Sequence, residues 1–390
     1  MLSIKNELFV WEFNRIGKIP ELLTEVNFNG KRFNNSNKGE TTNKIFKITL
    51  FPNYLKTSIA NNNSFRLKKI KHLNFSGAGI TFKYPETIDG FLSKYMKSQD
   101  RKNIKRSISR LETSFNINYK IYYGSITKED YTFLLEKLRT FLEIRFSQKQ
   151  MLNYFLNEWD KNINGLYKLI IQKKASFFTI YDRDKLISIS LNRHFENCLM
   201  FSDCNGYDID YNKYGIGNLD NYRLTKWCIE NKYDFLDLGV GIVDYKKKWC
   251  DTYYNFDYLI YYRKKSIAAK VLSTLEIGKI NMKNTIKKIK IDKLIKNLKK
   301  KQKYSYENIS YNIEQVPNLD TFNIKKEAVL DIYSQETKDI RKAVYDYLYT
   351  NKLHINTVNI YQILNETNTY LLKFPKEILK VTVNKDRYAG

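Results

Sequence analysis

The stretch from Tyr211 to Trp249 constrains the fold more than any other part of the chain. Two glycines, Gly215 and Gly217, directly precede a helical pattern from Asn218 to Asn231, whose apolar residues cover one broad face. Glycine takes positive φ freely and has no Cβ, so the backbone N–H groups at such a helix start can approach a single anion closely. The sequence therefore predicts a phosphate-binding turn that leads into a helix.

A short strand and a second glycine turn follow this helix. Tyr233 to Leu238 is aromatic and apolar, as a buried strand is, and Gly239 and Gly241 then let the chain turn sharply. A basic and aromatic cluster ending at Trp249 comes next. Strand-like segments before and after the helix predict an α/β domain.

This arrangement resembles the GNAT acyltransferase superfamily, and most closely its CelD/BcsL-type, Fem-related branch. GNAT proteins hold the pyrophosphate of acetyl-CoA with Arg/Gln-x-x-Gly-x-Gly/Ala between a strand and a helix. The matching residues here are Asn212, Gly215 and Gly217, with Asn212 standing where Arg or Gln is usual.

Two further segments carry the resemblance, which covers roughly Phe82 to Tyr262. The ending FLDLGVGIVDYKKKW is similar to that of the branch. The residues on matching positions are Asp237, Gly241, Tyr245, Lys246 and Trp249. Upstream, the basic segment Ile88 to Glu112 and the helix-borne Arg145 are similar to the opening of the same domain.

The resemblance implies a GNAT-type mixed sheet flanked by helices and an acyl-CoA co-substrate, with no metal. The implied acyl-CoA contacts are Asn212, Gly215, Ile216, Gly217, Asn218 and Lys246, and the implied acceptor contacts are Arg145, Gly241 and Trp249. Asp237 is expected to orient or deprotonate the acceptor, and Tyr245 to protonate the departing CoA thiolate. Direct attack on the thioester needs no covalent enzyme intermediate.

Four domains are predicted along the chain. Residues 1–75 are expected to form a reduced N-terminal lobe, residues 76–263 the GNAT-like domain, residues 264–303 basic amphipathic helices, and residues 304–390 an α+β appendage of the C-terminal part.

Hydrophobic periodicity also predicts the individual elements. The predicted strands are Leu8–Phe13, Ile45–Phe51, Tyr167–Ile171, Ser176–Tyr181, Leu186–Asn192, Cys198–Asp203, Tyr253–Tyr262, Thr369–Phe374 and Ile378–Val383. The predicted helices are Lys94–Glu112, Lys128–Phe146, Ser266–Glu276, Met282–Lys303 and Glu327–Thr350, with a break near Gly278.

The composition is that of a globular, strongly basic protein, with 43% hydrophobic residues and a formal net charge of +26. Such a charge suits an anionic partner such as a phosphorylated cofactor, tRNA or a membrane surface, and coding bias toward lysine explains it equally well. The 4 Cys form no C-x-x-C pair and the 3 His are scattered, so no zinc site is predicted. No apolar run reaches the ~20 residues of a membrane span, and we expect a cytoplasmic protein with peripheral contact with an anionic membrane as an option.

Several functions remain open at this stage. The resemblance favours acyl-CoA-dependent N- or O-acylation of a polar, sugar-containing precursor of the cell envelope or of a polysaccharide. Phosphate neutralisation by the basic helices favours the Fem-type alternative, in which an aminoacyl-tRNA is the donor. A nucleic-acid-binding module without catalysis is the second alternative.

Two short motifs point to other enzymes. The segment Asp237 to Gly241 matches the Asp-x-Gly-x-Gly start of an S-adenosylmethionine site, which requires a doubly wound sheet. Asp208 and Asp210 match the Asp-x-Asp pair of metal-dependent glycosyltransferases. Both are weak signals because each is very short.

Overall fold

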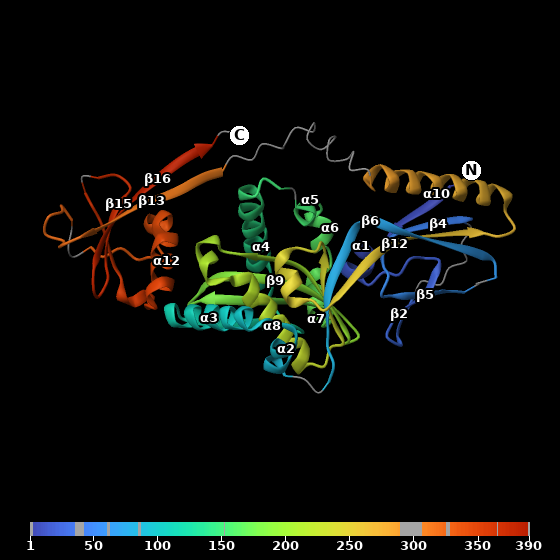
Figure 1. The fold of residues 1–390 in the computed structure, drawn as a ribbon, viewed down its shortest axis with the longest axis horizontal. Helices are drawn as coiled ribbons and strands as arrows, with labels where there is room; N and C mark the ends of the chain where they lie inside the picture. The colour runs from blue at the N-terminus through green and yellow to red at the C-terminus, as the bar shows by residue number, and fades with distance from the viewer. Residues whose placement is uncertain are drawn as a thin grey trace. The chain divides into compact units, whose positions relative to one another are not determined.

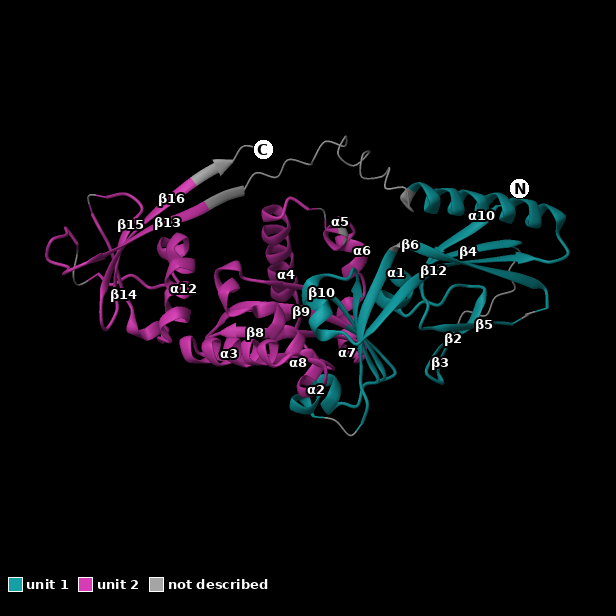
Figure 2. Cartoon of the chain, viewed as in Figure 1, with its two compact units in different colours: residues 1–91, 193–203, 227–300 teal, residues 92–192, 204–226, 301–390 magenta. Residues whose placement is uncertain are grey.

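The computed structural model describes residues 3–35, 43–60, 63–84, 87–151, 153–288, 306–324, 328–364 and 366–388. The chain forms two compact units, shown in Figure 2. Unit 1 comprises residues 1–91, 193–203 and 227–300, and unit 2 comprises residues 92–192, 204–226 and 301–390. The units interleave along the chain, and the domain boundaries predicted at 75, 263 and 303 stay predictions.

Unit 1 is built on a mixed sheet (Figure 1). Its elements are β1 (Ile4–Leu8), α1 (Phe9–Ile16), β2 (Leu23–Phe28), β3 (Lys31–Asn34), β4 (Ile45–Pro52), β5 (Lys56–Ile59), β6 (Phe65–Thr81), β11 (Phe235–Val240), α9 (Asp244–Trp249), β12 (Thr252–Arg263) and α10 (Ile267–Lys288). The strand order is β1-β4-β12-β6-β11, and the first residues of β10 (Leu199–Tyr207) pair with β11. The pairs β1–β4 and β10–β11 are parallel and the others antiparallel, while β3-β2-β5 form a separate small sheet.

The core of unit 1 is rich in phenylalanine and lies on one face of this sheet. Phe9 and Phe13 of α1 stack at 4.9 Å and pack against the sheet with Phe46 and Ile48 of β4. Because side chains alternate along a strand, Lys47 points to the opposite face, where its Nζ lies 2.7 Å from Glu276 Oε1 of α10. Helices thus cover both faces of the unit 1 sheet.

Unit 2 holds the remaining strands and most of the helices. Its elements are α3 (Ser98–Ser114), β7 (Ile117–Tyr122), α4 (Lys128–Gln148), α5 (Tyr154–Asn157), α6 (Trp159–Ile163), α7 (Leu166–Ile171), β8 (Ala175–Asp182), η1 (Ile209–Tyr214), β13 (Tyr306–Val316), η2 (Gln335–Ile340), α12 (Arg341–Asn351), η3 (Ile355–Thr357), β14 (Asn359–Gln362), β15 (Thr369–Lys373) and β16 (Ile378–Tyr388). The elements β9 (Lys185–Phe195), β10, α2 (Ile88–Tyr95) and α8 (Ile216–Glu230) contribute residues to both units. The strand order is β7-β8-β9-β10, and β13-β16-β15-β14 form an antiparallel second sheet.

The C-terminal segment of unit 2 shares a core with the predicted glycine turn. Tyr211 and Tyr214 of η1 pack with Phe115, which follows α3, and with Tyr345 of α12, all four fully buried. The Tyr211 and Tyr345 rings lie 4.6 Å apart. The C-terminal segment therefore packs through α12 onto the turn that precedes α8, and Figure 1 shows α12 beside α3.

The predicted α/β class, a mixed sheet flanked by helices, is confirmed by this architecture. Two predicted strands are wrong. Leu8–Phe13 falls mostly in helix α1, because Phe9 and Phe13 are buried at i, i+4 spacing and Gly17 closes the helix at φ 67°. Tyr167–Ile171 lies in helix α7, where Leu166 and Ile170 repeat the same spacing. Short apolar runs fit either structure.

Helix boundaries account for the other corrections. The predicted break near Gly278 is absent: α10 runs through it, because Ala269, Ser273 and Ile280 stay buried at helical spacing and one exposed glycine costs only about 1 kcal/mol. Residues 289–303 of the predicted second helix lie outside the described part of the chain. The basic helix predicted from Lys94 is two helices, α2 and α3, and α12 begins at Arg341 rather than near Glu327. None of the described helices has the length and apolarity that crossing a membrane would require.

Candidate functional site

The glycine turn lies in unit 2, where η1 ends and α8 begins. Gly215 adopts the left-handed conformation at φ 66° and ψ 39°, which glycine takes without strain. Its carbonyl accepts hydrogen bonds from the N–H groups of Asn218 at 2.9 Å and Leu219 at 3.2 Å. The first N–H groups of a helix lack the i−4 partners of its interior, and here those of Asn218 and Leu219 donate to Gly215 instead; the first turn of α8 carries no acidic side chain. The start of α8 therefore suits an anion.

The space around the two glycines differs. A Cβ on Gly215 would lie 3.3 Å from Ser107 Oγ of α3, whereas no described atom lies within 4 Å of a Cβ on Gly217. Gly217 is also not among the positive-φ glycines. The positive φ of this turn therefore falls on Gly215, and Gly217 needs none. The backbone at Gly217 is open to approach.

A tyrosine brings two of the predicted residues, Asn212 and Arg145, together. Tyr207 donates from its hydroxyl to Asn212 Oδ1 at 3.1 Å, and the Arg145 guanidinium lies 4.7 Å from the centre of the Tyr207 ring. Lys149, at the end of the same helix α4, has its pKa lowered by burial and by the charge of Arg145. The positive charge of Arg145 therefore lies beside Tyr207, which holds the side chain of Asn212.

A buried carboxylate on α8 was missed by the sequence reasoning. Asp220 Oδ2 accepts hydrogen bonds from Ser188 Oγ and from Asn205 Nδ2, both at 2.9 Å. Burial raises the pKa of Asp220 to about 6. Arg145 Nη1 reaches Asn205 Oδ1 at 3.5 Å, so this network begins at a predicted residue. The position of Asp220, three residues after Gly217, was the only signal in the sequence.

Asp237 lies in unit 1, near the end of strand β11, and is 1% exposed. Its carboxylate accepts hydrogen bonds from Tyr54 Oη at 2.7 Å, from Tyr254 Oη at 2.6 and 2.8 Å, and from the Gly239 N–H at 2.6 Å. Burial raises the pKa of Asp237 above its usual value, against the effect of these donors. Tyr54 lies 183 residues from Asp237 in the sequence and Tyr254 lies 17 residues from it, and no short motif connects either tyrosine to the carboxylate. The carboxylate is fully engaged with protein donors.

The side chain of Lys246 contacts the backbone of the second glycine turn, which contains Gly239 and Gly241. Its side chain is buried, and Nζ donates to the carbonyl oxygens of Gly239 at 3.1 Å and Val240 at 2.9 Å. Burial lowers the pKa of this amine. Gly239 and Gly241 have φ values of 76° and 91°, as the predicted sharp turn requires. Lys246 thus has two backbone partners, and its predicted contact with acyl-CoA stays a prediction.

Tyr245 and Trp249 lie on helix α9 with opposite exposure. Tyr245 is 45% exposed, whereas Trp249 is buried at the other end of this short helix. Of the residues predicted to act on the acceptor or the leaving group in unit 1, Tyr245 is the one that presents its side chain to solvent. The packing of Trp249 indicates a structural contribution to α9.

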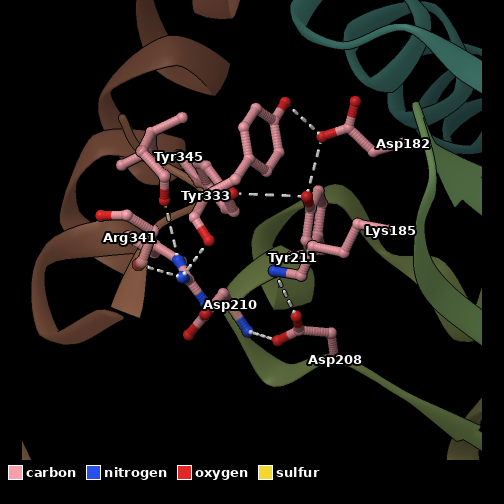
Figure 3. Close-up of polar contacts among 10 residues, drawn as sticks. Asp182, Lys185, Asp208, Asp210, Tyr211, Tyr333, Arg341 and Tyr345 are labelled. Carbon is pink, nitrogen blue, oxygen red and sulfur yellow. Dashed lines mark hydrogen bonds and ion pairs between the residues drawn. The ribbon is translucent and has the colours of Figure 1, made fainter. Parts of the chain in front are cut away.

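The glycine turn is also held by a polar cluster in unit 2, drawn in Figure 3. Tyr211 and Tyr333 both donate to Asp182 Oδ2, at 2.9 and 2.8 Å, and Tyr211 Oη lies 3.3 Å from Tyr345 Oη. Because Tyr211 belongs to η1 and the other two tyrosines to the C-terminal segment, the cluster joins that segment to the turn.

Neither the Asp208–Asp210 pair nor the Asp237–Gly241 segment lies in the structural context that its alternative function requires. The Asp208 carboxylate pairs with Lys185 Nζ at 2.8 Å and accepts a hydrogen bond from the Asp210 N–H at 3.0 Å (Figure 3). Its partners are therefore groups of the protein itself. Within the described ranges, no group of three metal-ligating side chains was found. Strand β11 is followed by α9 and pairs antiparallel with β6, which is not the doubly wound sheet of an S-adenosylmethionine site.

Comparisons with known proteins give one family and a set of distant structures. Residues 98–247 match the family described as an acetyltransferase (GNAT) domain. No curated protein matches the chain.

Three of the similar solved structures illustrate the distance. A conserved protein of unknown function from Bacteroides thetaiotaomicron VPI-5482 is 11% identical at TM-score 0.39, with 57% of this chain and 70% of that chain covered. FemX is 10% identical at TM-score 0.39, with 56% and 72% covered. The C-terminal DUF2156 domain of a putative lysylphosphatidylglycerol synthetase from Agrobacterium fabrum is 9% identical at TM-score 0.36, with 60% and 71% covered. Structural similarities this weak do not indicate the function of this chain.

Proposed function

Because the chain contains a GNAT-type acetyltransferase domain, the domain of an acyltransferase, we propose that it transfers an acyl group from acetyl-CoA or another acyl-CoA to an amine or hydroxyl. The acceptor we propose is a polar, sugar-containing precursor of the cell envelope or of a polysaccharide. This acceptor rests on the resemblance to the CelD/BcsL-type branch.

The observation that carries the proposal is the start of helix α8. A left-handed Gly215, an open approach at Gly217 and a first turn without acidic residues together supply backbone N–H donors to a diphosphate. Arg145 adds positive charge beside Tyr207, which holds Asn212. We infer that the pyrophosphate of the acyl-CoA binds here.

The proposed chemistry is direct attack of the acceptor on the thioester carbon. Tyr245 is proposed as the general acid that gives its proton to the departing CoA thiolate, since its side chain is exposed on α9. Asp237 is proposed as a positioning residue, because both of its oxygens already accept hydrogen bonds and its pKa is raised by burial. It fixes the end of β11, from which the turn toward Tyr245 starts.

Calorimetric titration of the purified protein with acetyl-CoA tests the donor. We expect saturable binding that free CoA displaces, because CoA retains the pyrophosphate that α8 is proposed to hold. A folded sample that gives no heat with acetyl-CoA at millimolar concentration would refute the donor assignment. Displacement by 3′,5′-ADP alone would instead place the affinity in the adenosine part.

An aminoacyl-tRNA is the second candidate donor, and the formal charge of +26 favours it. The exposed side chains of Lys102 and Arg106 on α3 add to this, since α3 lies beside the glycine turn. Filter binding of charged tRNA at two salt concentrations distinguishes the donors. Saturable binding of charged tRNA that bulk RNA does not displace, together with no detectable binding of acetyl-CoA, would identify tRNA as the donor.

A further inference from the structure

Helix α10 of unit 1 has one face packed on its own sheet. Ala269, Ser273 and Ile280 are buried at helical spacing, and Asn284 Nδ2 donates to the Lys71 carbonyl of β6 at 3.1 Å. Glu276, the acidic residue of this helix, also lies on this face and pairs with Lys47 of β4. Figure 2 shows α10 within unit 1. One face is therefore fully accounted for by packing.

The opposite face carries a stripe of exposed apolar side chains. Ile267 is 83% exposed and Met282 60%, fractions far above those of ordinary packed residues. The stripe consists of Ile267, Val271, Leu275, Met282 and Ile286. Each residue advances about 100° around the helix axis, so the i, i+4 steps from Ile267 to Leu275 and from Met282 to Ile286 keep these side chains on one side. Gly278 lies on the same side of the helix and contributes no side chain to the stripe.

Lysines border this stripe on both sides. Lys270 flanks it on one edge, and Lys279 and Lys283 flank it on the other, all exposed. No acidic residue lies on the exposed face of α10, since the sequence of this helix contains only Glu276, which faces the sheet. The sequence directly after the described end of the helix continues with further lysines. An apolar stripe between two basic borders matches the layering of an anionic lipid surface, with acyl chains beneath charged headgroups.

We propose that α10 is a docking surface for an anionic membrane, lying flat with its apolar stripe among the acyl chains and its lysines at the phosphates. At about 1.5 Å per residue, its 22 residues give a contact line of roughly 33 Å. Nucleic acid would use the lysines but leave the apolar side chains in water. A second copy of the same face would bring two rows of lysines together, which like-charge repulsion opposes.

Vesicle co-sedimentation with the full chain tests the proposal. Vesicles containing about 30% phosphatidylglycerol in phosphatidylcholine are compared with pure phosphatidylcholine at about 0.1 M and about 0.5 M salt. We expect the partition coefficient to be at least tenfold higher on the anionic vesicles at low salt and to fall at high salt. The readout needs no substrate, so its result is independent of the proposed acyl transfer.

Two pairs of substitutions separate the apolar and electrostatic contributions. Val271→Gln with Leu275→Gln should weaken partition at least tenfold, while the control Phe133→Gln with Ile144→Gln, two exposed apolar positions on α4, should not. The pair Lys270→Glu with Lys283→Glu should abolish the preference for anionic vesicles.

The charge pair has its own control at equal net charge, Lys128→Glu with Lys168→Glu, which removes exposed lysines from α4 and α7. Equal partition of the parent on neutral and anionic vesicles would overturn the proposal. So would unchanged binding by the α10 variants, or losses in the control variants as large as those in α10.

Discussion

Replacing Gly217 by valine separates a phosphate-binding turn from an ordinary loop between a strand and a helix. Gly217 lies in the first turn of α8, has no positive φ, and leaves the position of a Cβ free of described atoms within 4 Å. The protein itself therefore tolerates a side chain here. Any large effect of valine must come from a ligand that needs the same space.

The magnitude follows from the hydrogen bonds that a bound phosphate would make. A side chain that keeps one phosphate oxygen from a backbone N–H removes a charge-assisted hydrogen bond, about 1.5–3 kcal/mol. The dissociation constant for acyl-CoA should then rise roughly tenfold to a hundredfold. The free energy of unfolding should stay within about 0.5 kcal/mol of the parent, because valine has a slightly better helix propensity than glycine.

Calorimetry with acetyl-CoA and urea unfolding of the same samples measure both quantities. Gly278→Val is the matched control, since Gly278 is also a helical glycine with no described atom within 4 Å of its Cβ position, and it lies on α10. Acyl-CoA affinity unchanged in Gly217→Val, or reduced equally in Gly278→Val, would refute the assignment of the turn.

Two further predictions concern unit 1. Asp237→Asn should cost about 1–3 kcal/mol of unfolding free energy, because one oxygen must replace two for three donors. Burial raises the pKa of Asp237, so the protonated carboxyl stabilises the folded parent below the ordinary aspartate pKa of about 4, and this stability is lost as the pH rises through the raised pKa. The difference in unfolding free energy between parent and variant should therefore narrow toward pH 7. A difference that widens with pH in urea unfolding would contradict this. Tyr245→Phe should lower kcat at least a hundredfold in steady-state assays with stability kept, and turnover within about threefold of the parent excludes it as the general acid.

The glycine turn was predictable from the sequence because its conformation is local. The left-handed Gly215 and the helix after it depend on adjacent residues, and so does the turn at Gly239 and Gly241. The partners of Asp237 were not predictable. Tyr54 reaches it from 183 residues away in sequence, and no periodicity links the two positions.

The wrong element assignments have a common physical cause. The α1 and α7 segments are short and mostly apolar, so a period of two and a period of 3.6 fit them equally well, and burial of one face decides for helix. The hydrogen-bond partners of Lys246 were not predictable for another reason. A lysine beside a predicted phosphate site reads as a phosphate ligand, whereas in the folded chain its amine is buried against two carbonyl groups.

The C-terminal segment also changes how the positive charge near the glycine turn is interpreted. Lys213 Nζ donates to the Asp346 carbonyl of α12 at 3.2 Å, and Arg110 Nη1 of α3 donates to the carbonyls of Tyr349 and Thr350. Cations at the end of a helix stabilise its unpaired carbonyl groups, so both side chains serve α12. The basic face of α3 is therefore partly structural. If the proposed diphosphate binds at this turn, it should depend mainly on the backbone of α8 and on Arg145, and the formal charge of +26 overstates what the turn offers an anion.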